Sequence, residues 1–177
     1  MSTKIGVFDF YTLSKSIPVI DVRSPKEFET GHYPGAYNIP IFNNDERTIV
    51  GTIYKKISRN DSVLKGLELV GPKLKDFAQQ AQQIAKNNQL LIYCWRGGMR
   101  SASMAWLFET VGIKTHILTG GYKAFRRAGK VRLSKTEKLM VLGGLTGSGK
   151  TETLQEIQKQ GEQVCDLEGL AHHKGSA

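Results

Sequence analysis

Short apolar runs alternate along this chain with longer stretches in which apolar and polar residues recur at helical spacing. The apolar runs, each of a length typical of buried strands, are Val7–Phe10, Pro18–Val22, Leu90–Cys94, Thr115–Thr119 and Leu139–Gly143. The helical stretches between them are Ser24–Thr30, Pro72–Asn87, Ser101–Val111 and Lys150–Gln160. This alternation predicts an α/β fold with a mainly parallel sheet flanked by helices.

The stretch Pro72–Asn87 has the clearest helical period. Its apolar residues recur at i, i+3 and i+4 spacing, which predicts an amphipathic helix packed on the sheet. They are Leu74, Phe77, Ala78, Ala81, Ile84 and Ala85. Gly112 follows the stretch Ser101–Val111 and predicts the C-terminal cap of that helix.

Composition narrows the functional classes. The 177 residues are 40% hydrophobic, which suffices for a core, and carry a net charge of +9, which favours a polyanionic partner such as nucleic acid. A basic protein without a nucleic-acid partner remains an alternative. Cys94 and Cys165 provide no disulfide framework, and no metal-ligand spacing occurs, so we expect no metal site among the cysteines and histidines. No signal peptide or membrane-spanning segment is visible, so we expect a cytoplasmic protein that does not enter a membrane.

The segment between the strand ending at Cys94 and the following helix is the first candidate site. It consists of Cys94, Trp95, Arg96, Gly97, Gly98, Met99 and Arg100. The paired glycines permit positive φ angles, and the backbone N–H groups of such a turn converge near a helix N-terminus, where they attract anions. The same field, with Arg96 and Arg100 nearby, is expected to lower the pKa of the Cys94 thiol. We therefore predict a reactive thiolate at Cys94 in an anion-binding loop formed by residues 95–100.

The second candidate site is a glycine-rich loop, G-L-T-G-S-G-K-T, between a predicted strand and a predicted helix. Its phosphate-binding candidates are Gly144, Gly147, Ser148, Gly149, Lys150 and Thr151. Backbone N–H groups in this pattern surround phosphates, the lysine reaches terminal phosphate oxygens, and the threonine can hold Mg²⁺.

A basic segment separates the two candidate sites. Residues 122–138 carry seven lysines and arginines against one acid, Glu137, and we expect a domain boundary there. Either a solvated linker or a nucleic-acid contact accounts for this charge. Beyond it we expect one strand, the glycine loop, a helix and a second short strand, Gln163–Leu167. About forty residues cannot complete a doubly wound domain, so the sequence predicts only a partial P-loop domain over residues 137–177.

Two further segments carry a family resemblance. Residues 21–28 read D-V-R-S-P-K-E-F, and residues 31–40 read G-H-Y-P-G-A-Y-N-I-P. With the later cysteine loop they resemble the rhodanese family of sulfurtransferases, which implies a rhodanese-like domain over residues 11–134. The resemblance also implies that Cys94 accepts a terminal sulfur or selenium atom as a persulfide or perselenide. Arg100 follows Cys94 by six residues, one more than in ordinary rhodaneses. That length resembles cell-cycle phosphatases and arsenate reductases, so phosphate chemistry stays open.

The combination of a rhodanese-like and a P-loop segment resembles the tRNA 2-selenouridine synthases. Four stretches match that family: Glu46–Lys55, Tyr93–Ser101, Gly120–Arg126 and Asp166–His172. Members of the family are about twice as long, so the chain is expected to stop inside its second domain. The longer cysteine loop belongs to the pattern of this family.

This resemblance implies a selenium transferase acting on tRNA. Selenium from selenophosphate would replace the sulfur of wobble 2-thiouridine, through an intermediate geranylated by geranyl diphosphate. Cys94 would carry selenium as a perselenide, while Arg96, Arg100 and the loop amides hold the phosphate of selenophosphate. Lys150 would bind a diphosphate, with Mg²⁺ on Thr151, and the basic segment would lie near the tRNA backbone. The expected partners are tRNA and a selenophosphate-producing enzyme. A sulfurtransferase, a cysteine-dependent phosphatase or arsenate reductase, and a non-catalytic RNA-binding fragment are the alternatives.

Overall fold

The computed structural model describes residues 2–134, 140–145 and 147–170, which divide into two units between residues 135 and 136. All the strands found in the described residues lie in the first unit, and the described residues of the second form two helices. The predicted domain boundary falls in the same part of the chain, between residues 122 and 138.

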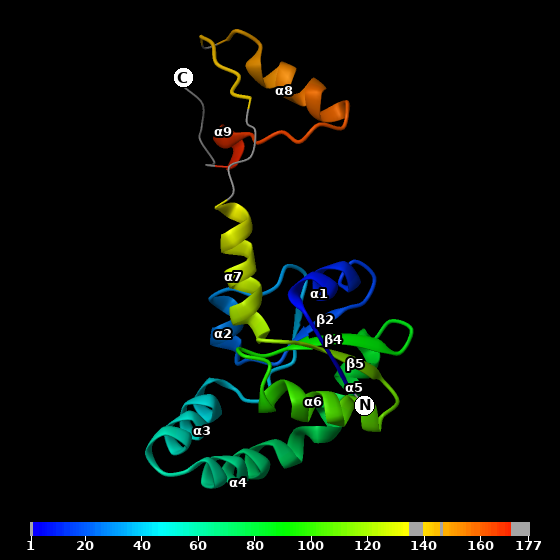
Figure 1. Ribbon diagram of the computed structural model, residues 1–177, viewed down its shortest axis with the longest axis vertical. Coiled ribbons are helices and arrows are strands. Elements are labelled where there is room, and N and C mark those ends of the chain that lie inside the picture. Colours follow the sequence, from blue (N-terminus) through cyan, green and yellow to red (C-terminus); the bar gives the residue numbers. More distant parts are fainter. Residues whose placement is uncertain (1, 135–139, 146, 171–177) are drawn as a thin grey trace. The chain divides into compact units, whose positions relative to one another are not determined.

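The first unit is built on a parallel five-stranded sheet (Figure 1). Its strands are β1 (Thr3–Ile5), β2 (Val19–Asp21), β3 (Tyr37–Asn38), β4 (Gln89–Tyr93) and β5 (Lys114–Leu118). The spatial order is β1-β5-β4-β2-β3, and every neighbouring pair is parallel. The predicted α/β class and parallel sheet are therefore confirmed.

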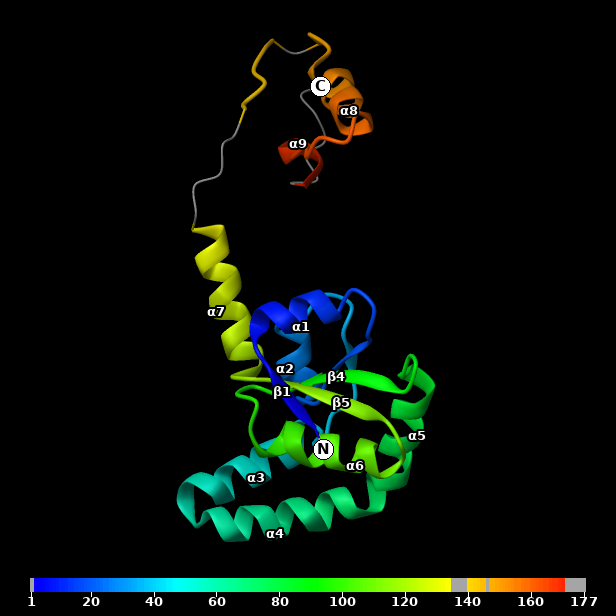
Figure 2. The ribbon, with the colours of Figure 1, turned by 45° about the vertical axis from the view of Figure 1, so that its right-hand side comes forward.

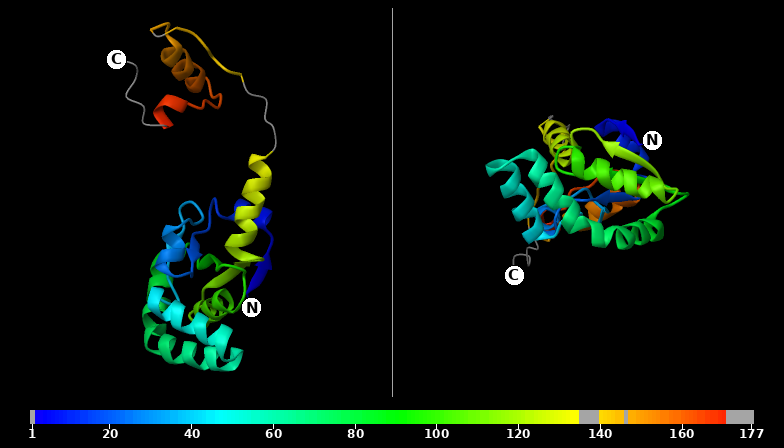
Figure 3. Two further views of the ribbon diagram at one scale, coloured as in Figure 1. Left: turned by 90° about the vertical axis from the view of Figure 1, so that its left-hand side faces the viewer. Right: turned by 90° about the horizontal axis from the view of Figure 1, so that it is seen from below.

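Helices cover both faces of this sheet (Figures 1 and 2). On one face lie α1 (Val7–Leu13) and α7 (Gly121–Leu133). On the other lie α3 (Asn44–Lys56), α4 (Arg59–Val70), α5 (Leu74–Ile84) and α6 (Met99–Thr110), which Figure 3 also shows from below. The short α2 (Pro25–Glu29) follows β2, and a 3-10 turn, η1 (Gly71–Lys73), joins α4 to α5.

Alternation along β4 explains why the sheet has two cores. Leu90, Ile92 and Cys94 pack into the cluster that includes Phe77, Ala81, Met104 and Phe108. Leu91 and Tyr93 point the other way, into the cluster that includes Phe10 and Tyr33. Successive side chains of a strand face opposite sides, and a parallel sheet covered on both faces needs apolar residues on each. The central strand is therefore apolar and buried from Leu90 to Tyr93.

Local capping residues fix the helices next to the site. Ser24 and Glu27 form a capping box at α2, and Asn43 and Glu46 form another at α3. These boxes satisfy backbone N–H groups that the first helical turn leaves unpaired. Gly112, with φ of 85°, follows α6 in the left-handed conformation, as its predicted capping role requires.

The predicted strand Val7–Phe10 is wrong, because these residues begin α1. Val7, Phe10 and Leu13 pack into the core at a spacing of three residues, whereas Phe8 is 80% exposed. The β-branched and aromatic composition suggested a strand, but the burial period is helical. The edge strand is instead the preceding Thr3–Ile5.

Two predicted strands of the second unit are also wrong. Met140–Gly143 form no strand, and Leu139 lies outside the described residues. Residues 163–166 are irregular, and Leu167–Leu170 form the short helix α9. A strand needs a partner for its backbone hydrogen bonds. None of the described residues of this unit forms a strand that could provide one. The predicted helix there is confirmed as α8 (Lys150–Lys159).

Candidate functional site

Cys94 lies at the carboxyl end of β4, between β2 and β5 in the sheet. The loop Trp95–Gly98 follows it, and α6 then begins at Met99. In open parallel sheets, ligands bind beyond the carboxyl ends of the strands, where helix N-termini present unpaired N–H groups. The predicted anion-binding loop thus lies at the carboxyl end of the central strand, where such ligands bind, and it connects Cys94 to the N-terminus of α6.

The loop is held by the start of α7. The backbone N–H of Tyr122 donates to the Cys94 carbonyl at 2.9 Å, and that of Lys123 donates to the Trp95 carbonyl at 3.1 Å. Gly97 and Gly121 have φ angles of 66° and 59°. A Cβ on Gly121 would collide with the Cys94 carbonyl and with the amide nitrogens of Arg96 and Gly97. Only glycine permits this close approach of two backbone segments.

The surroundings of Cys94 favour its ionised form. Burial raises the pKa of the Cys94 thiol, but the Ser101 hydroxyl, the charge of Arg100 and the backbone amides of Ser101 and Arg96 lower it more. The net pKa lies below the ordinary thiol value. The Ser101 Oγ is 3.3 Å from the Cys94 Sγ and donates to the Gly98 carbonyl at 3.0 Å. This agrees with the expected direction of the pKa change, and Ser101 contributes to it although it lies outside the predicted loop.

Arg100 is engaged by a carboxylate from a distant part of the sequence. Its Nη1 donates to the Glu27 Oε2 at 2.8 Å, and its Nη2 lies 3.4 Å from the Glu27 Oε1. The Arg47 Nε lies 3.6 Å from the same Glu27. Burial raises the pKa of Glu27, but the hydrogen bond and charge of Arg100, the Ser24 amide and Arg47 lower it more. Glu27 therefore orients two arginines beside the loop, and Arg100 has more N–H donors than this pair uses.

Arg96 has a different environment, because it is exposed and forms no ion pair within the described part of the chain. Together with Cys94 and Arg100, it lines one cavity, which Gly98 and Met99 also line. Trp95 lines the cavity as well, and its ring also packs against that of Tyr122, with the centroids 6.0 Å apart. Trp95 therefore both lines the cavity and anchors the loop.

A buried ion pair supports the inner side of this loop. Arg23 is 1% exposed and binds Asp21 through its Nη2 at 2.6 Å. Its guanidinium lies 4.0 Å from the centroid of the Tyr122 ring and 5.9 Å from that of Trp95. Arg23 also donates to the Gly31 carbonyl at 2.7 Å. The Asp21–Arg23 pair thus joins β2 to the loop and to α7.

A cavity of about 680 Å³ opens beside Cys94. One wall is the cysteine loop with the start of α6, and the other is formed by α3 and α4. The sequence did not predict these two helices, although their capping residues Asn43 and Ser58 are typical helix starts. Their inner wall includes Phe42, Val50 and Val70.

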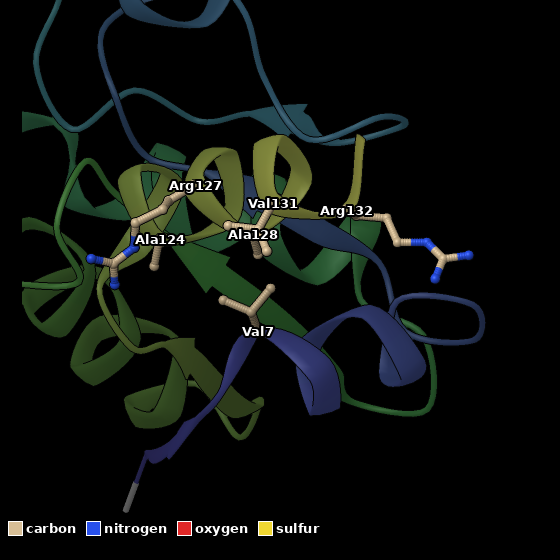
Figure 4. A pocket seen from close by; sticks show the side chains of 6 residues that line it. All are labelled: Val7, Ala124, Arg127, Ala128, Val131 and Arg132. Atoms are coloured by element: carbon tan, nitrogen blue, oxygen red, sulfur yellow. The ribbon is translucent and has the colours of Figure 1, made fainter. Parts of the chain in front are cut away.

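A second hollow of about 430 Å³ lies between α1 and α7 (Figure 4). Val7 faces Ala124, Ala128 and Val131, while the side chains of Arg127 and Arg132 extend to either side (Figure 4). Its lining contains no thiol, hydroxyl or carboxylate side chain. It therefore offers no group for covalent or acid–base chemistry.

The second unit contains the glycine-rich loop. Gly147 and Gly149 have φ angles of 77° and 78°, and α8 begins at Lys150. The Lys150 Nζ donates to the carbonyls of Gly144 and Leu145 at 3.0 and 2.7 Å, so the lysine folds back over its own loop. Ser148 and Thr151 are exposed at the start of the helix. None of the described side chains of this unit is buried.

Positive-φ glycines directly before a helix are features that the glycine-rich motif predicts. Thr151 could provide one hydroxyl ligand to Mg²⁺, with phosphate oxygens as the others. The described residues contain no group of three or more histidine, cysteine or acidic side chains placed to bind a metal. They also contain no helix that is both long and apolar enough to cross a membrane.

Two family descriptions match the sequence. The family described as rhodanese-like domain matches residues 9–128, and the one described as tRNA 2-selenouridine synthase AAA domain matches residues 137–177. The crystal structure of the N-terminal domain of a Clostridium difficile 630 protein is 40% identical, with a TM-score of 0.64. The alignment covers 73% of this chain and 98% of that one.

Curated relatives match nearly the whole chain. A tRNA 2-selenouridine synthase from Nitrosomonas europaea is 41% identical over 98% of this chain and 46% of its own length. One from Bdellovibrio bacteriovorus is 41% identical over 92% of this chain and 44% of its own length. The chain thus spans a little under half the length of these relatives.

Proposed function

We propose that this chain, which belongs to the rhodanese-like domain family, takes part in exchanging sulfur for selenium in tRNA. Its sequence similarity to tRNA 2-selenouridine synthases supports the proposal. The substrate is the 2-thiouridine at the wobble position, and the selenium donor is selenophosphate, made by a separate enzyme. The observation that carries the proposal is an ionisable thiol, Cys94, beside arginines and converging backbone amides. The reducing cytoplasm suits this role, since it keeps Cys94 a free thiol.

Cys94 is proposed to accept selenium from selenophosphate. Its thiolate attacks the selenium atom, a sulfur–selenium bond forms, and the selenium–phosphorus bond breaks with its electron pair on phosphorus. Electron balance therefore makes phosphite the leaving group and leaves Cys94 as a perselenide anion. Arg96, Arg100 and the N–H groups of residues 95–100 would hold the departing phosphorus oxyanion.

The perselenide then reacts with the modified base. Its terminal selenium attacks C2 of a geranylated 2-thiouridine, and geranyl thiolate leaves. A low-molecular-weight thiol attacks the Cys94 sulfur, so the selenium–sulfur bond breaks with its electron pair on selenium and 2-selenouridine is released. A second thiol molecule reduces the resulting mixed disulfide and restores Cys94.

The P-loop residues are proposed to bind geranyl diphosphate. Lys150 and the N–H groups around Gly147, Ser148 and Gly149 would contact the diphosphate, and Gly144 gives the loop room next to the Lys150 side chain. A Mg²⁺ ion on Thr151 would supply additional positive charge for phosphate binding. Positive-φ glycines and the position of Lys150 at the start of α8 support this assignment.

The proposal is tested by measuring selenouridine in tRNA. Cys94→Ser and its control Cys165→Ser are introduced into the protein that the cell expresses. The tRNA of these cells is then hydrolysed, and its selenouridine is measured by mass spectrometry. We expect Cys94→Ser to abolish selenouridine, whereas Cys165→Ser, at an exposed cysteine of the second unit, retains it. Unchanged selenouridine with Cys94→Ser would refute the mechanism. Turnover of an aryl phosphate that depends on Cys94 would favour the phosphatase alternative.

A further inference from the structure

The cavity beside Cys94 is larger than a small oxyanion requires. Its volume of about 680 Å³ is within the range of pockets that enclose a drug-sized molecule, ~300–1,000 Å³. Phosphate or selenophosphate alone would occupy only the part next to the loop amides. The remaining space lies between the cysteine loop and the pair α3–α4.

The charge around the cavity is of one sign. Its lining includes Arg47, Lys55, Arg59, Arg96 and Arg100, and it includes no acidic residue. Glu27 pairs with Arg47 and Arg100 from outside this lining. Lys55, Arg59 and Arg96 are exposed and form no ion pair within the described residues. Three cations are therefore available to anionic groups of a ligand larger than phosphate.

Exposed apolar and aromatic side chains gather at the same cavity. Tyr54 is 60% exposed, Leu67 is 63% exposed and Met99 is 48% exposed, and all three line it with the partly buried Trp95. A concentration of exposed large apolar side chains marks an interaction surface. Aromatic residues interleaved with arginine and lysine are typical of sites for unpaired nucleotides, whose bases stack while the cations contact phosphates.

From these observations we infer that the cavity between α3–α4 and the cysteine loop receives an unpaired nucleotide of an RNA. Its base lies against Tyr54 and the apolar wall, and its flanking phosphates contact Lys55, Arg59 and Arg96. A base in this position is presented to the Cys94 sulfur, which lines the same cavity. Enzymes that modify a base take it out of its stack into such a pocket. The inference rests on the proposed function for its choice of RNA.

The first test compares matched variants. Binding of a short hairpin RNA with 2-thiouridine in its loop is measured by fluorescence anisotropy over a range of salt concentrations. Lys55→Gln is expected to lower the slope of log affinity against log salt by about one. Lys56→Gln removes the same charge from the next residue, which does not line the cavity, and should change the slope less. Tyr54→Ala should weaken binding about tenfold, while Tyr37→Ala, at a similarly exposed tyrosine outside the cavity, should not.

The second test reports on the position of Cys94. In a Cys165→Ser background, the hairpin RNA should slow alkylation of Cys94 by iodoacetamide several-fold, and a duplex of the same sequence should not. Equal losses with Lys55→Gln and Lys56→Gln, or unchanged alkylation of Cys94, would overturn the inference. A loss with Lys130→Gln on α7 but not with Lys55→Gln would also overturn it, because the RNA would then lie on α7.

These outcomes are separate from the selenium chemistry. A hairpin with uridine in place of 2-thiouridine should also protect Cys94, since the cavity binds the nucleotide by stacking and charge. Protection without any selenium transfer would refute the proposed function and retain the nucleotide site. Selenium transfer without protection by RNA would do the reverse.

Discussion

Removing the Ser101 hydroxyl tests the electrostatic account of Cys94. The Ser101 Oγ lies 3.3 Å from the Cys94 Sγ, and Ser101 is fully buried, so water cannot replace the hydroxyl without rearrangement. When Cys94 is ionised, the Ser101 hydroxyl can turn its single proton from the Gly98 carbonyl to the sulfur, and this hydrogen bond favours the thiolate. Ser101→Ala should therefore raise the pKa of Cys94. Ser103→Ala, on the same helix and at the cavity but with no hydrogen bond to Cys94, is the matched control.

The size of the effect follows from two opposing terms. A hydrogen bond to a charged group contributes ~1.5 kcal/mol, which corresponds to about a tenfold lower thiolate fraction at a pH below the pKa. The remaining thiolate is more nucleophilic, by about threefold for this change in basicity. The net reaction with a disulfide reagent should then be about threefold slower in Ser101→Ala at low pH. Above both pKa values it should be about threefold faster.

The assay is the rate of reaction with an aromatic disulfide as a function of pH, in a Cys165→Ser background so that only Cys94 reports. The two pH–rate profiles should cross, and the Ser103→Ala profile should follow that of the parent. Superimposable profiles for Ser101→Ala and the parent would refute the role of Ser101. A uniformly slower variant that does not cross would show that Ser101 controls access to the sulfur and not its ionisation.

Three further substitutions and one control test the support of the loop. Gly121→Ala should lower the free energy of unfolding by about 3 kcal/mol, from its positive φ and the collision with the Cys94 carbonyl. Gly129→Ala is the control, because Gly129 lies in the same helix with open space around it, and it should raise the free energy of unfolding by about 1 kcal/mol. Both values are measured by urea denaturation, and equal effects of the two substitutions would contradict this contrast. Asp21→Asn should cost about 3 kcal/mol in the same measurement, because the Arg23 charge stays buried without its partner; a loss below ~1 kcal/mol would argue against that. Glu27→Gln should cost about 1.5 kcal/mol at neutral pH. Folding lowers the pKa of Glu27, so this stabilisation is present above its unfolded pKa of about 4.3 and is lost as pH falls through the folded pKa. If Glu27→Gln still lowered the free energy of unfolding in acid, the result would contradict the ion pair.

The central part of the fold was predictable because its signals are local. The run Leu90–Cys94, the glycines after it and the helix ending before Gly112 each carry a strong pattern, and the structure has β4, the loop and α6 there. The helices α3 and α4 were not predicted. Several of their large apolar side chains, such as Tyr54 and Leu67, are exposed at the cavity and obscure the helical period. Apolar side chains that face the cavity and not the core thus weaken the pattern on which helix prediction depends.

Contacts between distant segments could not be predicted. Glu27 reaches Arg100 across 73 positions of sequence, and α7 binds the carbonyls of the cysteine loop. The sequence pattern around Glu27 indicates only that it caps a helix together with Ser24, and nothing in it points to Arg100. The error at Val7–Phe10 has a different origin, because β-forming side chains were read as a strand where the core selects a helical spacing. Propensity is a weak prior that tertiary packing overrides.

The most direct test of the central claim is whether selenium becomes bound to Cys94. The chain is incubated with selenophosphate, its Cys94 peptide is analysed by mass spectrometry, and the phosphorus product is identified by NMR. We predict the addition of one selenium atom to Cys94 with an equal amount of phosphite, and neither in Cys94→Ser. Release of phosphate while Cys94 stays unmodified would contradict the claim that Cys94 carries the selenium.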